Sequence, residues 1–384
     1  EGVTILKTGV FRDCNSLVSA SVPSTITSMG NYAFSGCTAL TSVTITPGIT
    51  TIQQYMFQNC SALEEITIPS TVTSIGNYAF SRCSLLASID IPDTVTTIGT
   101  YAFQRTAITS FTPPSGVTVI QNYCFEGCTG LTTVTIPSGI TTINQNAFQG
   151  CTGLTSVTIP STVTSIGNSA FSGCTALATL TLSEGLTTIG SGAFNSCSSL
   201  TAISIPATVT SISTNSFQRC TSLTAITVAA GNTKYHSTDD VLFRTSDKQL
   251  ILYPAGKSGP YDIPAGTLVI GANAFQYCAS LTAVTIPGSV RVIDGWAFEY
   301  CTGLRELNLS DGLTTISGYA FEYCESLESV HIPDSVTYLG AEAFCLCKSL
   351  ADVHLGAGLT ELQRDCFQGC ENLTAIVIPD SVTS

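Results

Sequence analysis

Apolar and hydroxyl-bearing residues alternate along residues 154–159, where the sequence LTSVTI follows the pattern LxxVxI. This alternation is typical of a β-strand with one buried and one exposed face. Pro160 ends the strand, because a proline has no backbone N–H to donate to a neighbouring strand. A second, shorter strand is predicted over residues 163–166. The next residues, 167–173, are too few for a full helix and predict a helical or 3₁₀ turn.

The same 23-residue pattern recurs along almost the whole chain, and a near copy of residues 151–173 begins at Cys174. A repeat of roughly 20 to 50 residues is typical of a solenoid, in which each unit buries its apolar side only against its neighbours. The sequence therefore predicts a β-rich solenoid, and each of its coils is called a rung below. Because the core of a solenoid grows lengthwise, we expect a single domain over residues 1–384. Both ends fall inside a rung, so we also expect an uncapped fragment of a longer chain.

The repeat is interrupted between Cys220 and Cys278, where the spacing is 58 residues instead of 23. Two β-rich runs, residues 241–243 and 250–253, flank a polar turn, which is the signature of a β-hairpin. We therefore predict a β-hairpin insertion over residues 229–260. Insertions in solenoids lie on one face and are often functional, and a purely structural role is the alternative.

Fourteen of the seventeen cysteines occupy one repeat position. They are Cys14, Cys37, Cys60, Cys83, Cys128, Cys151, Cys174, Cys197, Cys220, Cys278, Cys301, Cys324, Cys347 and Cys370. Equivalent residues of stacked rungs lie about 4.8 Å apart, which is within the Cα separation that a disulfide tolerates. Their side chains should nevertheless point the same way, and Thr106 fills the position in one rung. The sequence thus favours a ladder of buried thiols over disulfides between rungs.

Three cysteines lie outside this ladder. Cys124 and Cys366 replace the alanine that precedes the repeat phenylalanine, so we expect both to be small core residues. Cys345 follows Phe344, at a position that other rungs fill with serine, glutamine or glutamate. We therefore expect Cys345 to be exposed and reactive.

Aromatic residues recur five residues before the ladder position. They are Tyr32, Tyr55, Tyr78, Tyr101 and Tyr123, followed after a gap by Trp296 and Tyr319. This spacing predicts a packing row, because stacked aromatic neighbours gain about 0.5–1.5 kcal/mol per pair beyond burial. A platform for a carbohydrate or a protein is the alternative, since exposed tyrosines are common interface anchors.

The exposed strand positions are mostly threonine, serine and alanine in the first ten rungs and become charged near the end of the chain. The candidate partner-binding residues are Arg305, Glu306, Asn308, Glu328, His331, Asp352 and His354. His331 and His354 share one repeat position in adjacent rungs, so their Cα atoms should lie about 5 Å apart. Together with a nearby carboxylate, the two imidazoles are a set of ligands that Zn²⁺ can bind. A solvated polar patch is the simpler interpretation, and we predict no metal and no other cofactor.

The repeated strand pattern resembles a leucine-rich repeat, and the form LTSVTIPSTVTSIGNSAFSGC closely resembles the BspA-like family. This resemblance covers essentially the whole chain. It implies a surface or secreted protein of a bacterium or protist that adheres to a host, to matrix or to neighbouring cells. The family carries no catalytic motif, so the resemblance transfers no active-site residue.

The composition argues against several functions. Charged residues make up only 10% of the chain, against about 25% in typical domains. The net charge of −13 argues against nucleic acid, which needs a basic surface, and against anionic lipid. No apolar run approaches the roughly 20 residues of a membrane span. The three histidines match no catalytic motif, so we expect no enzyme.

These observations predict a non-enzymatic, adhesin-like binding module at the cell surface or secreted, with its signal and anchor outside this sequence. Its exposed strand face would contact a protein or a glycan on a host, in matrix or on a neighbouring cell. The alternative is a structural spacer or fibre-forming array that assembles end to end, because an exposed rung is a template for strand pairing.

Overall fold

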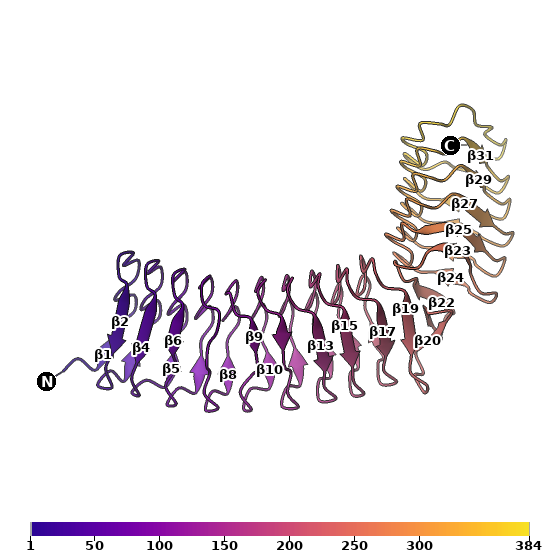
Figure 1. Cartoon of the computed structure of the whole chain (residues 1–384). Coiled ribbons are helices and arrows are strands. Elements are labelled where there is room, and N and C mark those ends of the chain that lie inside the picture. Colours follow the sequence, from indigo (N-terminus) through magenta and orange to yellow (C-terminus); the bar gives the residue numbers. More distant parts are fainter. Residues whose placement is uncertain (1, 384) are drawn as a thin grey trace. The chain divides into compact units, whose positions relative to one another are not determined.

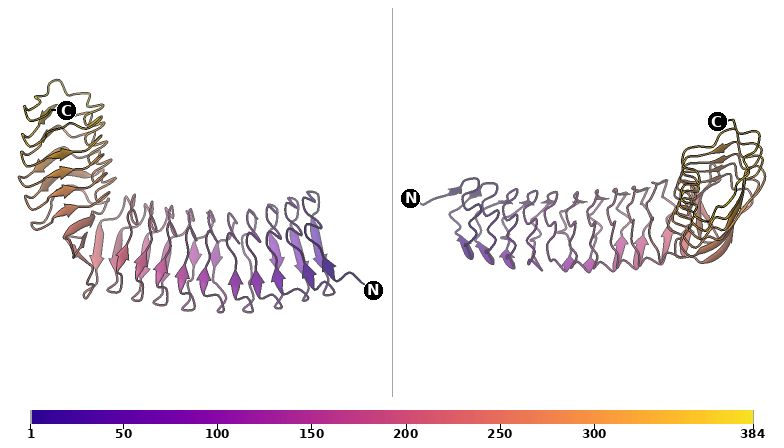
Figure 2. Two further views of the ribbon diagram at one scale, coloured as in Figure 1. Left: turned by 180° about the vertical axis from the view of Figure 1, so that it is seen from behind. Right: turned by 90° about the horizontal axis from the view of Figure 1, so that it is seen from above.

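The computed structural model describes residues 2–383 and divides into two compact units. Unit 1 comprises Glu1–Ser199 and Ser211–Phe217, and unit 2 comprises Leu200–Thr210 and Gln218–Ser384. Within each unit, successive rungs are stacked with their strands in parallel (Figures 1 and 2). The solenoid of 23-residue rungs is thus confirmed, while the single domain over 1–384 stays a prediction. Residues 2–383 include no helix with the length and apolarity that a bilayer span requires.

Each regular rung of unit 1 contributes one long strand to a parallel sheet. One sheet contains β2 (Ser19–Val22), β4 (Ser42–Ile45) and β6 (Glu65–Thr67). A second contains β9 (Ser110–Phe111), β11 (Thr133–Val134), β13 (Ser156–Ile159) and β15 (Thr179–Leu182). Ser156 pairs with Thr179, exactly one repeat further on, so the register follows the sequence period. In β13, Val157 and Ile159 are buried while Ser156 and Thr158 are exposed, as the alternation predicts.

A second, two-residue strand in most rungs builds another set of parallel sheets in unit 1. The pairs and ladders are β1 (Ile5–Leu6) with β3 (Ser28–Met29), then β5 (Thr51–Ile52), β7 (Ser74–Ile75) and β8 (Thr97–Ile98). The longest is β10 (Val119–Ile120), β12 (Thr142–Ile143), β14 (Ser165–Ile166), β16 (Thr188–Ile189) and β18 (Ser211–Ile212). In β14 and β16 the isoleucine is buried in the core and its hydroxyl-bearing neighbour is half-buried.

Unit 2 repeats this arrangement. Its long strands are β17 (Ala202–Ile205) with β19 (Ala225–Val228), then β23 (Gly259–Asp262), β25 (Leu281–Ile286) and β27 (Glu306–Leu309), then β29 (Ser329–His331) with β31 (Asp352–His354). Its short strands are β24 (Val269–Ile270), β26 (Val292–Ile293), β28 (Thr315–Ile316) and β30 (Tyr338–Leu339). Three insertion strands, β20 (Tyr235–Thr238), β21 (Val241–Arg244) and β22 (Gln249–Leu252), extend this short-strand sheet.

The predicted β-hairpin is confirmed, since β21 and β22 pair antiparallel. Two features go beyond the prediction. The strand β20 also pairs antiparallel with β21, and β22 pairs parallel with the short strand β24 of the next rung. Tyr253, which follows β22, stacks on Phe275 with ring centroids 4.8 Å apart. The end of the insertion therefore takes the place of the short strand and the aromatic residue of an ordinary rung.

The turn segment of each rung contains no helix among the described residues, but it is closed by bonds of 3₁₀ spacing. The Cys174 N–H donates to the Phe171 carbonyl three residues earlier at 3.2 Å. The Phe171 N–H donates to the Ala193 carbonyl of the next rung at 2.8 Å. Since every backbone donor in a core must find a partner, these bonds between rungs let the turn side stack as tightly as the strand side.

Two ladders fill the core on the turn side. The repeat phenylalanines are buried and stacked, with Phe171 lying 5.1 Å from Phe148 and 5.4 Å from Phe194 between ring centroids. Beside them the ladder cysteines are thiols, as the sequence favours. The Cys174 thiol donates to the Phe148 carbonyl of the preceding rung at 3.2 Å, and burial raises its pKa to about 12. These thiols are therefore protonated, hydrogen-bonded core groups.

Three ladder positions differ from the buried thiols of the regular rungs. Thr106 is buried, but its hydroxyl donates to the Phe103 carbonyl of its own rung at 2.9 Å, whereas the ladder thiols donate to the preceding rung. Cys14 is exposed and Cys370 is half-buried, whereas Cys124 and Cys366 are buried as predicted.

Candidate functional site

The seven predicted partner-binding residues all lie exposed on the long-strand side of unit 2, and together they are called the charged strand face. They form three rows across successive rungs. The rows are Arg305 and Glu328, then Glu306 and Asp352, then Asn308, His331 and His354. The backbone fixes these rows, because the Glu328 N–H donates to the Arg305 carbonyl at 3.4 Å and Asp352 is in register with Ser329. The face thus presents both signs of charge at fixed positions.

The histidine pair has the predicted register. His331 of β29 pairs with His354 of β31, and their rings stack with centroids 4.3 Å apart and an interplanar angle of 5°. The neighbouring carboxylates do not join them in a metal site. Across residues 2–383, the His, Cys, Asp and Glu side chains that come close enough to share an ion are Glu322, Glu342 and Cys345. Because the two rings cover each other's faces, the histidines expose mainly their polar ring edges.

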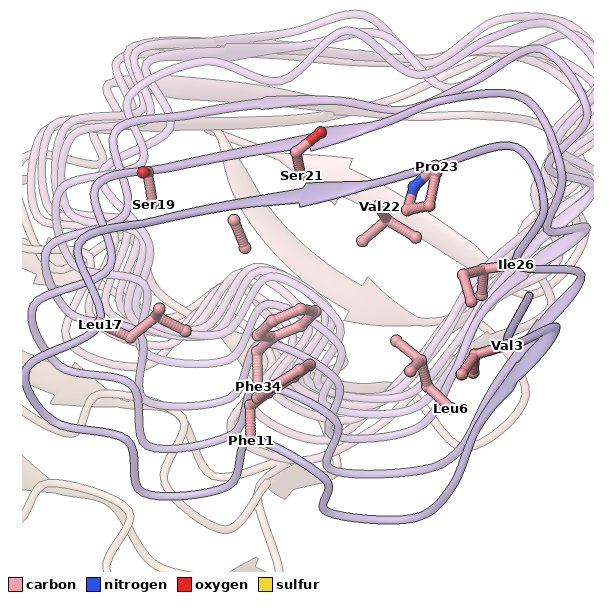
Figure 3. A pocket seen from close by; sticks show the side chains of 11 residues that line it. Val3, Leu6, Phe11, Leu17, Ser19, Ser21, Val22, Pro23, Ile26 and Phe34 are labelled. Atoms are coloured by element: carbon pink, nitrogen blue, oxygen red, sulfur yellow. The ribbon is translucent and has the colours of Figure 1, made fainter. Parts of the chain in front are cut away.

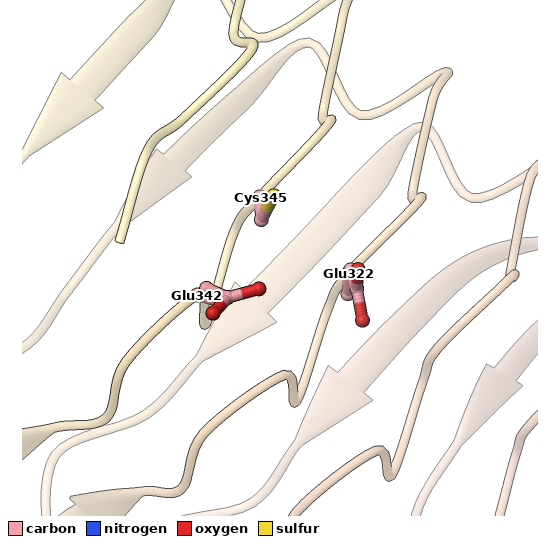
Figure 4. A group of neighbouring side chains, drawn as sticks. All are labelled: Glu322, Glu342 and Cys345. Carbon is pink, nitrogen blue, oxygen red and sulfur yellow. The ribbon is translucent and has the colours of Figure 1, made fainter. Parts of the chain in front are cut away.

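The cluster of Glu322, Glu342 and Cys345 lies in the turn segments of two neighbouring rungs, and Figure 4 shows Glu342 extending toward Glu322. One ligand atom from each residue lies within 4.8 Å of the others. Carboxylate and thiolate are ligands that Zn²⁺ accepts. Glu342, however, is already engaged, since Arg364 Nη2 lies 2.8 Å from its Oε1 and the Tyr319 hydroxyl donates to the same oxygen at 3.1 Å.

The prediction that Cys345 is exposed and reactive is wrong. Its side chain is only 3% exposed. Burial, followed by the negative charges of Glu322 and Glu342, raises its pKa to about 11, so it carries no thiolate at neutral pH. The same surroundings act on Glu322, where burial, with help from Glu299 and Glu342, raises the pKa to about 7. Cys345 and Glu322 thus hold their protons more tightly than isolated side chains would.

The predicted tyrosine row is present and stacked. Tyr78 lies 4.8 Å from Tyr55 and 4.5 Å from Tyr101 between ring centroids, with nearly parallel planes. The row resumes with Trp296 and Tyr319 at 5.3 Å. Because the rings cover each other's faces, mainly their edges meet solvent. This geometry agrees with a packing row and leaves little ring face for a flat ligand.

A second aromatic row escaped the sequence analysis. Tyr277, Tyr300 and Tyr323 directly precede ladder cysteines and stack with centroids 4.9 and 4.4 Å apart. The Arg219 guanidinium lies over the Tyr277 ring, 4.4 Å from its centroid. This row could have been predicted from the sequence, because these tyrosines recur at the repeat interval of 23 residues.

An apolar hollow of about 360 Å³ opens among the first rungs of unit 1 (Figure 3). Phe11 and Phe34 lie side by side in it, with ring centroids 5.2 Å apart, and Leu17, Val22 and Ile26 also line it. These are the same repeat positions that form the core in other rungs. The hollow is thus open core, a mainly apolar surface in which Ser19 and Ser21 supply the only side-chain polar groups of the lining.

Solved structures similar to this chain include bacterial leucine-rich repeat proteins. One from Bacteroides ovatus is 26% identical, with a TM-score of 0.59 over 97% of this chain and 81% of that chain. A leucine rich cell surface protein from Faecalibacterium prausnitzii is 28% identical, with a TM-score of 0.54 over 97% and 82%. The pneumococcal vaccine antigen PcpA, at 20% identity and a TM-score of 0.57 over 100% and 89%, shares the fold alone. No curated protein sequence matches the chain significantly.

The family model for the BspA type leucine rich repeat region matches residues 4–132, 118–244 and 269–384, which together include most of the chain. This match agrees with the observed rungs, whose long strands carry the LxxVxI pattern and whose register equals the repeat. The chain therefore belongs to the BspA-type leucine-rich repeat family.

Proposed function

We propose that this chain is an adhesin-like, non-enzymatic binding module of a cell-surface or secreted protein, and that a protein partner contacts its charged strand face. The observation that carries the proposal is the exposure of all seven residues on one regular surface. Leucine-rich repeat proteins generally bind other proteins, and one similar structure is described as a cell surface protein. Solenoids offer extended surfaces for such contacts.

The chemistry of the charged strand face favours a polar protein surface as its partner. Arg305 offers a guanidinium for a bidentate contact with a carboxylate. Glu328 and Asp352 offer acceptors for lysine or arginine, and the exposed ring edges of His331 and His354 offer nitrogen atoms for hydrogen bonds. Because these side chains are exposed, they form contacts without first breaking a buried network, which suits steering and specificity more than raw affinity.

The test is a pull-down with the immobilised chain against extracellular-matrix and cell-surface proteins. The test variant replaces Glu328, His331, Asp352 and His354 with alanine. The matched control replaces Glu64 and Glu65, two exposed charges on the long-strand side of unit 1. We expect capture of a partner by the wild type and the control and loss of capture in the test variant. Equal capture by all three proteins would refute the assignment to the charged strand face.

A structural, end-to-end array is the second candidate, favoured by exposed apolar side chains in both units. Val3 and Ile5 of unit 1 are 64% and 57% exposed, and Val377 and Ile378 of unit 2 are 81% and 55% exposed. Apolar strand residues of this kind are templates for association with another chain. Sedimentation velocity over a range of concentrations tests it, since a concentration-independent monomer would eliminate this candidate for the chain.

A further inference from the structure

The insertion in unit 2 forms a pocket together with the loop before β24. Its volume is about 370 Å³, which is within the range of small-ligand sites. One wall comes from the strands β20 and β21 and the β21–β22 turn, and the other wall is the loop of residues 264–267 before β24. Figure 1 labels β20, β22 and β24. The lining residues are His236, Thr238, Phe243, Thr245, Lys248, Pro264, Ala265, Gly266 and Thr267.

The lining is cationic in a strongly acidic chain. Lys248 is exposed at the pocket, and no carboxylate of residues 2–383 lies within ion-pair distance of its ammonium group. The nearest acidic residues in sequence already have partners. Asp247 is held by Arg244, whose Nε lies 3.0 Å from both carboxylate oxygens, and Asp240 lies 3.8 Å from Lys257. Lys248 is therefore available to an anionic group of a ligand.

The rest of the lining combines hydroxyl groups with an aromatic wall. His236 stacks on Phe243 with ring centroids 5.4 Å apart, and Phe243 is buried while His236 is exposed. A ring nitrogen of His236 lies 3.2 Å from the Thr245 hydroxyl. The exposed Thr238 and Thr245 add hydroxyl groups at the rim. Such a site can pack the apolar C–H face of a ring against an aromatic wall while it hydrogen-bonds the ring substituents.

The walls are held in place by hydrogen bonds, so the pocket exists before a ligand arrives. The Leu268 N–H donates to the Lys248 carbonyl at 3.0 Å, which ties the hairpin turn to the opposite loop. Within that loop the Thr267 hydroxyl donates to the Pro264 carbonyl at 2.8 Å. Gly266 has a φ of 93°, and a Cβ built there would meet no atom within 4 Å. Glycine thus allows the loop conformation and leaves the rim open.

We propose that this pocket binds an acidic sugar, meaning a pyranose that carries a carboxylate or sulfate group. Lys248 pairs with the anionic group, His236 supplies a stacking surface, and Thr238 and Thr245 bond the ring hydroxyls. The site is separate from the charged strand face. It does not depend on the proposed function, and either one can fail without affecting the other.

The experiment titrates glucuronate into the isotopically labelled whole chain and follows amide chemical shifts by NMR, with glucose as the uncharged analogue. The test variant is Lys248→Gln. The matched control is Lys234→Gln, which removes an exposed lysine of the same insertion that does not line the pocket. A terminal glucuronate on an oligosaccharide, titrated in parallel, distinguishes a free sugar from a polymer end as the source of the ligand.

We expect saturable shifts at pocket residues with glucuronate, and about tenfold weaker binding in Lys248→Gln than in Lys234→Gln, as the loss of a charge-assisted hydrogen bond implies. Glucose should bind more weakly than glucuronate. Three results would overturn the proposal: no shifts at the pocket with either form of glucuronate, equal affinity in the two variants, or equal affinity for glucose and glucuronate. Because both substitutions are on the surface, circular dichroism should show both variants folded.

Discussion

The tyrosine row occupies a backbone position that disfavours large side chains. Tyr78 has a φ of 57°, in the left-handed region, and the equivalent Ser169 and Gly192 have φ values of 52° and 61°. Glycine adopts this conformation freely, whereas for other residues it costs about 1–2 kcal/mol. A tyrosine that remains there must gain at least this much from its neighbours if the row is a packing device.

Replacing Tyr78 and Ser169 with glycine separates these two contributions. Ser169→Gly removes only the backbone cost, and after the entropy that glycine adds to the unfolded chain we expect a net gain of about 0.5–1 kcal/mol. Tyr78→Gly gains the same amount but loses two ring contacts, to Tyr55 and Tyr101. At about 0.5–1.5 kcal/mol per contact, this loss predicts a net destabilisation of about 0.5–2 kcal/mol.

Thiol labelling reports the local opening free energy at each site. Cys83 and Cys174 each lie five residues after the substituted position, and both are fully buried. In the native chain, with labelled peptides quantified by mass spectrometry, Tyr78→Gly should speed labelling of Cys83 by about 2- to 30-fold. Ser169→Gly should slow labelling of Cys174 by about 2- to 5-fold.

The internal control is the distant cysteine in each variant. Because a solenoid rung interacts mainly with its nearest neighbours, Tyr78→Gly should leave labelling of Cys174 unchanged. If Tyr78→Gly leaves labelling of Cys83 unchanged or slows it, the free energy gained by ring stacking does not exceed the cost of the left-handed backbone conformation. The packing interpretation would then be refuted, and the retained strain would point to a binding role for the row.

Two further predictions concern the cluster of unit 2. The pKa of Glu322 is raised from an ordinary 4.5 to about 7, so its contribution to stability is fully present below about pH 4.5 and is lost as the pH rises through 7. Glu322→Gln should therefore raise the unfolding temperature at pH 8 by a few degrees at most and leave it unchanged at pH 4; calorimetry showing the same shift at both pH values would contradict this. Iodoacetamide at pH 7.5 should label the exposed Cys14 much faster than Cys345, and comparable rates in peptide mapping would contradict the burial and raised pKa of Cys345.

The regular fold could be predicted because each rung repeats the same pattern of buried and exposed residues at the same spacing. The alternation in residues 154–159 identifies the buried face, and the fixed spacing leaves one pairing register, seen in the match of Ser156 with Thr179. The strands of the insertion were harder to predict from the sequence. Strand β20 (Tyr235–Thr238) has a single apolar residue, so no alternation marks it, and it is a strand because β21 offers it a partner. Tertiary pairing decided what local pattern could not.

The candidate site also contains residues whose exposure could be predicted and one whose burial could not. The charged strand face could be predicted because strand periodicity alone determines which side chains point outward. The burial of Cys345 could not be read from its equivalents in other rungs, because even small residues there differ and Ser172 is partly exposed. Ser35 and Ser81, at the same position, are 4% and 0% exposed, and they were the available warning.

Two residues of the charged strand face give up a contact that most regular rungs keep, as Glu64 of unit 1 also does. In ordinary rungs a threonine precedes the long strand, and its hydroxyl bonds the neighbouring rung, as Thr132 does to the Thr109 carbonyl at 3.1 Å. Arg305 and Glu328 occupy that same repeat position. Each forgoes a hydrogen bond worth about 0.5–1.5 kcal/mol at most, and as exposed charges they recover little through ion pairing. Stacking therefore does not account for these charges, and contact with a partner is the role that we propose for them.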